Sequence, residues 1–263
     1  MNIVKNLLRE NLHIESSLLE IKDELDFSAF KMNSTLNGDI WKSEDKIKGP
    51  IKNNLIKIAN DYWDSLELDF EYKDITMTGS LANYNWSRYS DIDVHIILDI
   101  NELGENSEMI KALLDTKTRV WNTEHDITIK TYDVELYLQP DDVEHHSSGV
   151  YSLLNDEWVV KPEKQVVKLD KENIRKKYKQ LVKTVGDIEE KAKAGEYEQV
   201  IKSAEAIKVK IKKMRQSGLE ENGEFSVENI VFKLLRRNDI METINNMLTQ
   251  AYDDSLTIVE KVK

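Results

Sequence analysis

An acidic pair and the glycine–serine dipeptide before it are the residues of this sequence best suited to chemistry. Gly79 and Ser80 follow one apolar run, and after ten intervening residues Asp91 and Asp93 open a second one. Side chains alternate across a strand, so the two carboxylates are expected on the same face. Two adjacent carboxylates repel each other unless a cation lies between them, and oxygen ligands of this kind suit Mg2+. The spacing predicts a divalent-cation site beside a turn whose N–H groups and hydroxyl can hold phosphate.

A third carboxylate comes from the apolar run at residues 127–138. Asp133, Glu135 and Tyr137 would share one face of a strand there. If this strand pairs beside the strand with the acidic pair, either Glu135 or Asp133 completes a cluster of three acids. Glu135 is favoured because it lies between two apolar neighbours, whereas Asp133 is nearer the start of the strand. Such a cluster can hold two metal ions about 3.5–4 Å apart, which predicts displacement chemistry at phosphorus.

The elements that must position these residues follow from the apolar patterns. We expect a strand, a turn with a short helix and a second strand over residues 75–98, because two β-branched runs flank a small polar connection. A helix is predicted over residues 51–66, and another around residues 106–121. Residues 149–160 read as a hairpin that turns at residues 155–156.

The chain divides into three predicted parts: an N-terminal helical segment (1–48), a core (49–162) and a helical C-terminal domain (163–263). Its first residues form an amphipathic pattern that predicts a helix before a less regular stretch. The C-terminal helices are expected at residues 170–193, 196–217, 226–237 and 239–262. The expected fold class is therefore α+β, a mixed sheet with flanking helices followed by an all-helical lobe.

Composition and charge limit the classes of protein that fit. The chain has 263 residues, of which 40% are hydrophobic and 33% charged, and it has no cysteine. No window approaches the roughly 18 apolar residues of a membrane span, and the N-terminal residues resemble no signal peptide, so we expect a cytoplasmic protein that does not bind a membrane. A formal net charge of −12 disfavours a sequence-independent coat on nucleic acid.

The charge is unevenly distributed along the chain. Residues 161–217 hold 17 basic and nine acidic residues, a net charge of +8, whereas the other residues carry a net charge of −20. Lys208, Lys212 and Arg215 are expected beside the packed face of one helix. A basic segment of this kind favours a triphosphate or an RNA backbone as partner. The alternative is that these helices are simply well solvated.

The ordered set of Gly79-Ser80, ten residues, Asp91-x-Asp93 and a later strand around Glu135 resembles the nucleotidyltransferase superfamily of DNA polymerase beta. The resemblance extends over roughly residues 50–140, and it implies a nucleotidyltransferase-type mixed sheet. It further implies that Gly79 and Ser80 bind the nucleotide, with Ser80 holding the triphosphate. By the same resemblance Asp91 and Asp93 bind two Mg2+ ions, which Mn2+ can replace. Glu135 would bind the catalytic metal and assist deprotonation of the acceptor hydroxyl.

The resemblance implies a metal-dependent nucleotidyltransferase that binds a nucleoside triphosphate such as ATP. It would move the nucleoside monophosphate to an acceptor hydroxyl with release of pyrophosphate, and an RNA 3′ end, including that of tRNA, is the first expectation for the acceptor. The alternatives are a cyclic-dinucleotide or oligonucleotide synthase, and a non-catalytic nucleotide-sensing or toxin–antitoxin module. A glycosyltransferase that uses the Asp-x-Asp is a more distant one. One departure stands out: many small members carry Arg-Gly after the alanine, where this chain has Asn83 and Tyr84.

Other residues near the motif have both functional and structural interpretations. His95 would share the face of the acidic pair, and it could bond a metal ligand or be a satisfied core histidine. Arg88 could contact a phosphate or pair with a surface acid. The aromatic residues of the connecting segment could stack on a base or pack on the sheet: Tyr84, Trp86 and Tyr89. The adjacent His145 and His146 are expected in a surface loop.

Overall fold

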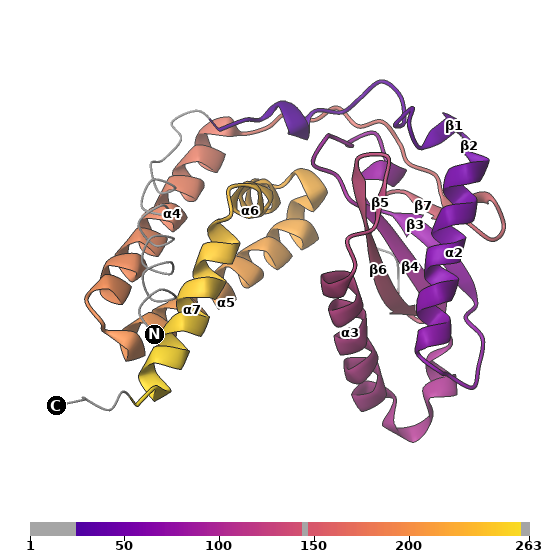
Figure 1. Cartoon of the computed structure of the whole chain (residues 1–263). Coiled ribbons are helices and arrows are strands. Elements are labelled where there is room, and N and C mark those ends of the chain that lie inside the picture. Colours follow the sequence, from indigo (N-terminus) through magenta and orange to yellow (C-terminus); the bar gives the residue numbers. More distant parts are fainter. Residues whose placement is uncertain (1–24, 144–146, 259–263) are drawn as a thin grey trace. The chain divides into compact units, whose positions relative to one another are not determined.

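The computed structural model describes residues 25–143 and 147–258, and its contacts divide the chain into two compact units (Figure 1). The first unit runs from Phe27 to Val167 and contains the strands. The second contains the helices after Lys168 together with Leu25 and Asp26. The described chain is thus of the α+β class, with a helical C-terminal part. The helix expected near the N-terminus lies outside the described residues.

The first unit is built on a six-stranded mixed sheet with the order β5-β6-β4-β3-β7-β8. The strands are β3 (Asp74–Thr78), β4 (Ile92–Leu98), β5 (Thr128–Ile129), β6 (Tyr132–Pro140), β7 (Val150–Ser152) and β8 (Glu157–Val160). β4 and β6 run parallel, and the other neighbours are antiparallel. This confirms the two strands around the motif and the hairpin turning near residue 156.

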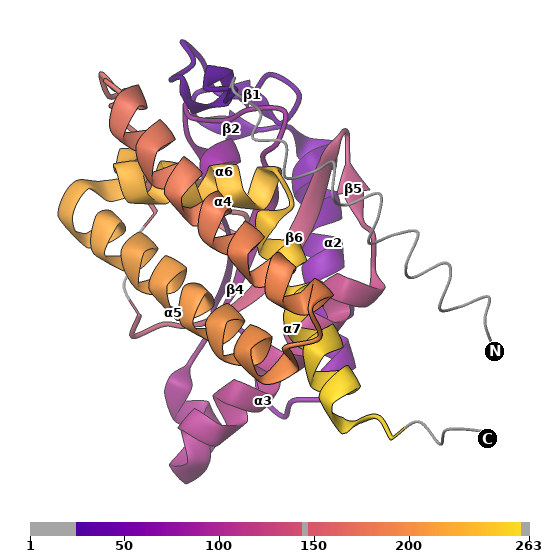
Figure 2. The same cartoon turned by 90° about the vertical axis from the view of Figure 1, so that its left-hand side faces the viewer.

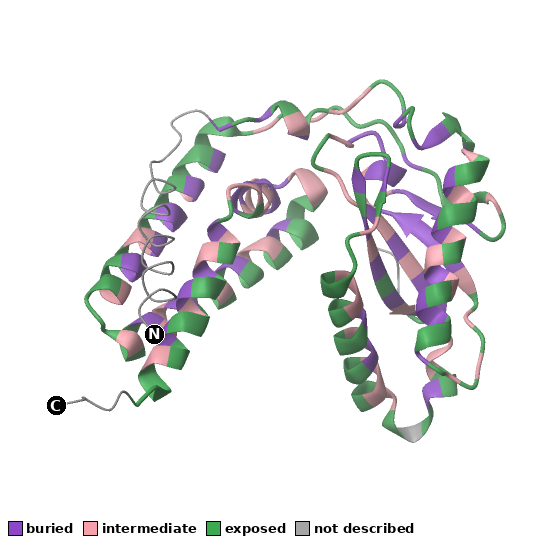
Figure 3. Cartoon of the chain, in the orientation of Figure 1, coloured by how far each residue is buried: buried purple, intermediate pink, exposed green. Residues whose placement is uncertain are grey.

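Helices α2 (Gly49–Ser65) and α3 (Ser107–Glu124) pack on the apolar face of this sheet. Ile92, Val94 and Ile96 alternate along β4 and are fully buried (Figure 3). They share one core with α2 side chains such as Tyr62, whose ring packs at a tilt against Trp121 of α3 with the ring centroids 5.2 Å apart. Because one face of β4 is committed to this core, the alternate side chains are presented on the opposite face. Both helices confirm the sequence predictions.

One local prediction for the first unit was wrong, and one small element was not predicted. Residues 127–138 form a hairpin rather than one strand, because Lys130 adopts a left-handed conformation (φ 63°) between β5 and β6. The stretch before α2 also contains a small hairpin, β1 (Trp41–Ser43) and β2 (Lys46–Ile47). Its strands are too short to produce a readable alternation.

The second unit consists of α4 (Lys171–Lys193), α5 (Tyr197–Asn222), α6 (Val227–Arg237) and α7 (Ile240–Leu256), with α5 contacting each of the other three (Figure 2). The Asp170 and Ser226 side chains cap α4 and α6 by accepting backbone N–H groups. All four helices confirm the prediction, although α5 continues past Gly218 to Asn222. One glycine destabilises a helix by only about 1 kcal/mol, so a packed helix can contain it. No helix among the described residues is long and apolar enough to cross a membrane.

An amide side chain connects α3 to the exposed edge of β6. β5 pairs only with Tyr132 and Asp133, and no other strand of the described residues continues along this edge. Asn122 of α3 donates to the Leu136 carbonyl at 2.9 Å and accepts from the Leu136 N–H at 3.1 Å. Both edge groups of the buried Leu136 are thereby satisfied.

We expect Asn122→Ala to lower the free energy of unfolding by about 2–3 kcal/mol, because two partly buried backbone groups lose their partner. Urea unfolding measures the change. Lys117→Ala on the exposed side of the same helix is the control, expected to stay within about 0.5 kcal/mol of wild type. If the two variants unfold at the same urea concentration, Asn122 does not stabilise the edge of β6.

Candidate functional site

The polar face of the sheet brings two of the predicted acids side by side. Thr78 of β3 pairs with Asp93 of β4, and Asp93 pairs with Glu135 of β6. Neighbouring strands lie about 4.7–4.9 Å apart, so the three side chains form one row across the sheet. Asp91 lies directly before β4, two residues from this row. Glu135 is thus the acid paired with Asp93, whereas Asp133 lies two residues earlier, at the position where β6 also pairs with Thr128 of β5.

Gly79 lies directly against the Asp93 carboxylate. Its backbone has φ 75° and ψ −162°, and a Cβ added there would lie 1.8 Å from Asp93 Oδ2. Both the conformation and the space therefore require glycine. The consequence is that the glycine–serine turn (residues 79–82) and the Asp93 carboxylate occupy adjoining positions at the end of β3.

Ser80 is held near the acidic pair by a second serine. The turn is a short 3-10 helix, η2 (Ser80–Ala82), in which the Ala82 N–H donates to Gly79 O at 3.2 Å. The Ser80 hydroxyl donates to Ser90 Oγ at 2.7 Å, and Ser90 directly precedes Asp91. The two ends of the connection between β3 and β4 are thus joined beside the carboxylates.

The indole of Trp41 in β1 also contacts this turn, donating to Leu81 O at 2.7 Å. No local pattern predicts this contact, because the two residues are 40 positions apart and β1 was not predicted.

A second row of polar side chains supports Glu135. The Tyr137 hydroxyl donates to Glu135 Oε2. The Tyr137 ring stacks on His95 with centroids 4.9 Å apart, and His95 Nδ1 lies 2.8 Å from Gln139 Oε1. An amide oxygen only accepts, so Nδ1 carries the proton in this arrangement. His95 therefore lies on the face that the sequence predicted, in contact with Tyr137 and Gln139.

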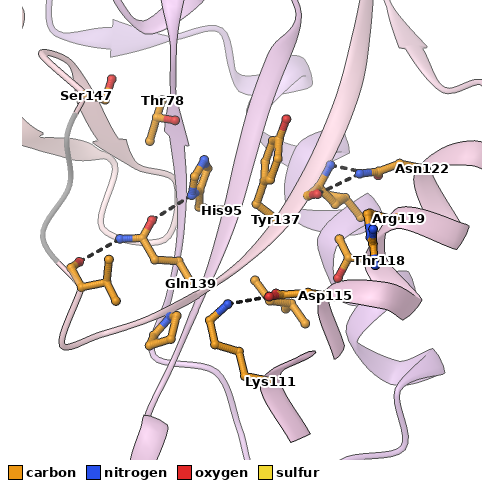
Figure 4. A pocket seen from close by; sticks show the side chains of 14 residues that line it. Thr78, His95, Lys111, Asp115, Thr118, Arg119, Asn122, Tyr137, Gln139 and Ser147 are labelled. Atoms are coloured by element: carbon orange, nitrogen blue, oxygen red, sulfur yellow. Dashed lines mark hydrogen bonds and ion pairs between the residues drawn. The ribbon is translucent and has the colours of Figure 1, made fainter. Parts of the chain in front are cut away.

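A pocket of about 580 Å3 opens beside the same face, between β6 and α3 (Figure 4). Its lining combines sheet residues such as His95 and Gln139 with Lys111 and Arg119 of α3. Lys111 is paired with Asp115 at 2.7 Å. The volume is typical of a small-molecule site. None of the predicted acids lines the pocket. Two of its lining residues lie next to them: Thr78, which pairs with Asp93, and Tyr137, which donates to Glu135.

The side chains present suit a hard divalent cation in their chemistry. Asp91, Asp93 and Glu135 supply carboxylate oxygens, the ligands that Mg2+ prefers. Within residues 25–143 and 147–258, however, no three His, Cys, Asp or Glu side chains are already grouped closely enough to hold a metal. The structure therefore places the donors as neighbours without showing a complete ligand set.

The remaining candidates are engaged in contacts within the first unit. The guanidinium of Arg88 lies 4.6 Å from the ring centroid of Tyr89. Tyr84 is buried, with the Lys164 ammonium 4.8 Å from its ring centroid. The Trp86 indole donates to Thr35 O at 2.9 Å. His145 and His146 lie outside the described residues.

Comparison of the chain with protein-family models, with curated proteins and with solved structures gives no match.

A second glycine allows the effect of the Gly79–Asp93 contact on stability to be separated from the effect of backbone strain. Gly104 has nearly the same conformation (φ 70°, ψ −160°), but a Cβ added there would meet nothing within 4 Å. We expect Gly104→Ala to lower the free energy of unfolding by about 1–3 kcal/mol, the usual cost of such strain. Gly79→Ala should cost more, because Asp93 must also move.

Thermal and urea unfolding of both variants, alone and combined with Asp93→Ala, measure the difference. In the Asp93→Ala background Gly79→Ala should cost about as much as Gly104→Ala. If the cost of Gly79→Ala is the same with and without the aspartate, the contact does not constrain the turn.

Proposed function

We propose that this protein is a metal-dependent nucleotidyltransferase that moves a nucleoside monophosphate from a nucleoside triphosphate to an acceptor hydroxyl. The observation that carries the proposal is the row in which Asp93 stands beside Glu135 and against Gly79. Two carboxylates at the end of a turn that presents backbone N–H groups suit a triphosphate with its cation. The nucleotidyltransferase-type sheet inferred from the motif belongs to the same proposal.

Each group of the site has a distinct task in this reaction. Asp91, Asp93 and Glu135 would hold the divalent ions, whose charge stabilises the developing negative charge on phosphate oxygens. The Ser80 hydroxyl and the N–H groups of Ser80 and Leu81 in the glycine–serine turn would orient the triphosphate. Glu135 would take the proton of the acceptor hydroxyl as its oxygen bonds to the α-phosphorus and the bond to pyrophosphate breaks. Catalysis would rest mainly on positioning and charge neutralisation.

Asp93→Asn should reduce pyrophosphate release by at least about 10³-fold while the protein remains folded, because charge stabilisation supplies most of the rate in such reactions. Asp133→Asn is the comparison variant, since Asp133 is the other acid on this face of β6 and the proposal assigns it no metal. The assay uses ATP, GTP, CTP or UTP with MgCl2 and total cellular RNA. A melting temperature that rises with Mg2+ in wild type and in Asp133→Asn, but not in Asp93→Asn, would support binding at these acids.

The labelled products separate the alternatives. Label in a cyclic or oligomeric nucleotide would indicate a synthase of such products, and label in RNA would identify an RNA acceptor. Nucleotide binding without pyrophosphate release under any condition would favour the non-catalytic module. Consumption of a nucleotide-sugar, with no requirement for Ser80, would favour a glycosyltransferase. Full activity in Asp93→Asn would overturn the assignment of the site.

RNA is the acceptor that we propose to test first, because α5 carries a basic surface. Lys212 is exposed and Lys208 is half-buried beside the packed residues Ile207 and Ile211. Arg215 is unsuitable as a phosphate probe: its Nε lies 3.3 Å from Asn229 Oδ1, and its guanidinium 4.2 Å from the ring centroid of Phe232. Reversal of its charge would disturb the packing of α5 on α6.

Lys208→Glu/Lys212→Glu should therefore weaken binding of a short RNA and reduce its dependence on salt between about 50 and 200 mM. Lys42→Glu/Lys117→Glu changes the net charge equally at exposed positions of the other unit and serves as control. Fluorescence anisotropy with labelled RNA measures both effects. Equal weakening by the two double variants would assign the effect to net charge and remove the case for RNA at α5.

A further inference from the structure

Residues 147–149, which we call the strap, cross the glycine–serine turn just before β7. The strap leads directly into β7, which pairs with β3: Met77 lies opposite Tyr151 and Thr76 opposite Ser152. β3 is also the strand that leads into the turn. The strap is thus anchored to the same strand as the turn that it contacts, although the two are separated by 68 positions between Gly79 and Ser147.

The backbone of the strap lies in direct contact with the end of the turn. A Cβ added at Gly149 would lie 2.0 Å from the Ala82 carbonyl oxygen. Such a distance leaves no room for any side chain, so the glycine allows the two backbones to approach. Pro162 closes the other side of this position, with its Cβ 3.3 Å from the same point.

Asn83 connects the strap to the end of the turn through its side chain. Asn83 is 4% exposed; its Oδ1 accepts from the Tyr84 N–H at 2.6 Å, and its Nδ2 donates to Ser148 Oγ at 2.5 Å. Both ends of the amide are therefore used. This gives a structural reason for asparagine at the position where the sequence departs from the Arg-Gly pattern.

Ser147 contacts the beginning of the turn. Its hydroxyl oxygen accepts from the Gly79 N–H at 3.3 Å, and the hydroxyl donates to Gly149 O at 2.9 Å. The strap thus holds the turn at both ends, through the Gly79 N–H and through Asn83. Within the turn, the Ala82 N–H donates to Gly79 O at 3.2 Å and the Asn83 N–H donates to Ser80 O at 3.1 Å. Two hydrogen bonds of a 3-10 turn are weak local support for a segment with a left-handed glycine.

We propose that Ser147 and Ser148 are positioning residues that hold the glycine–serine turn so that the N–H groups of Ser80 and Leu81 face its anionic ligand, while the Gly79 and Ala82 N–H groups stay bonded within the protein. The identity of that ligand, the triphosphate, rests on the proposed function. The role of the strap in holding the turn is independent of the proposed function. Without the serine hydroxyls the turn keeps its sequence and its glycine but loses its fixed orientation.

Loss of one such hydrogen bond should raise the KM for the nucleoside triphosphate about three- to ten-fold. Asn83 and Ser148 act through one contact, so Asn83→Ala/Ser148→Ala should raise KM no more than the larger of the two single changes. Ser147→Thr and Ser148→Thr keep the hydroxyl and should stay close to wild type. Ser65→Ala removes a serine hydroxyl that donates to Tyr62 O on α2, and it serves as the control for a general loss of stability.

The closing experiment combines KM and kcat for the nucleotide that wild type consumes with hydrogen exchange of the full-length protein. In Ser147→Ala and Ser148→Ala the backbone N–H groups of residues 79–83 should exchange faster, whereas those of the β4 core should not. Unchanged exchange at these residues, or KM effects of Asn83→Ala and Ser148→Ala that simply multiply in the double variant, would overturn the role of the strap. If wild type consumes no nucleotide, the proposed function fails, and the exchange measurement still decides whether the strap positions the turn.

Discussion

The parallel pairing of β4 with β6, in the register that sets Asp93 opposite Glu135, is the constraint on which the rest of the site depends. Parallel neighbours need a crossover connection, and α3 supplies it. The register is held by burial: Val134 and Leu136 join the core with Val94. A slip of one residue would move Glu135 into that core and the apolar side chains onto the polar face. Packing on one side of the sheet therefore determines which carboxylates meet on the other.

The same row concentrates features that oppose stability. Neighbouring carboxylates repel each other, and Gly79 adopts a conformation that few residues tolerate. Proteins accept such local conflicts mainly at functional sites, where a ligand relieves them. The surrounding contacts offset part of the cost here: Tyr137 donates to Glu135, and Ser80 bonds Ser90. The pocket beside α3 borders this row through Thr78 and Tyr137.

Much of the fold was predictable because its elements carry a clear period. The helices of the second unit and the apolar face of β4 repeat at 3.6 or two residues, which local sequence expresses directly. Prediction failed where a single backbone angle decides the structure, as at Lys130 between β5 and β6. It also failed for contacts between distant segments. Nothing local to Asn83 or Ser148 indicates that they meet, since 65 positions separate them.

The sequence by itself determined the types of element, the face of β4 that carries Asp93 and His95, and the oxygen-rich donors of the candidate site. It left open whether Glu135 or Asp133 would join them, because both lie on the same face of one strand. The tertiary structure added the register, which pairs Glu135 with Asp93 and leaves Asp133 two residues earlier, next to the short strand β5. It also brought the strap onto the glycine–serine turn. The physical reason is that periodicity is a local property of the chain, whereas strand pairing and register are selected by the apolar surface that the whole unit buries.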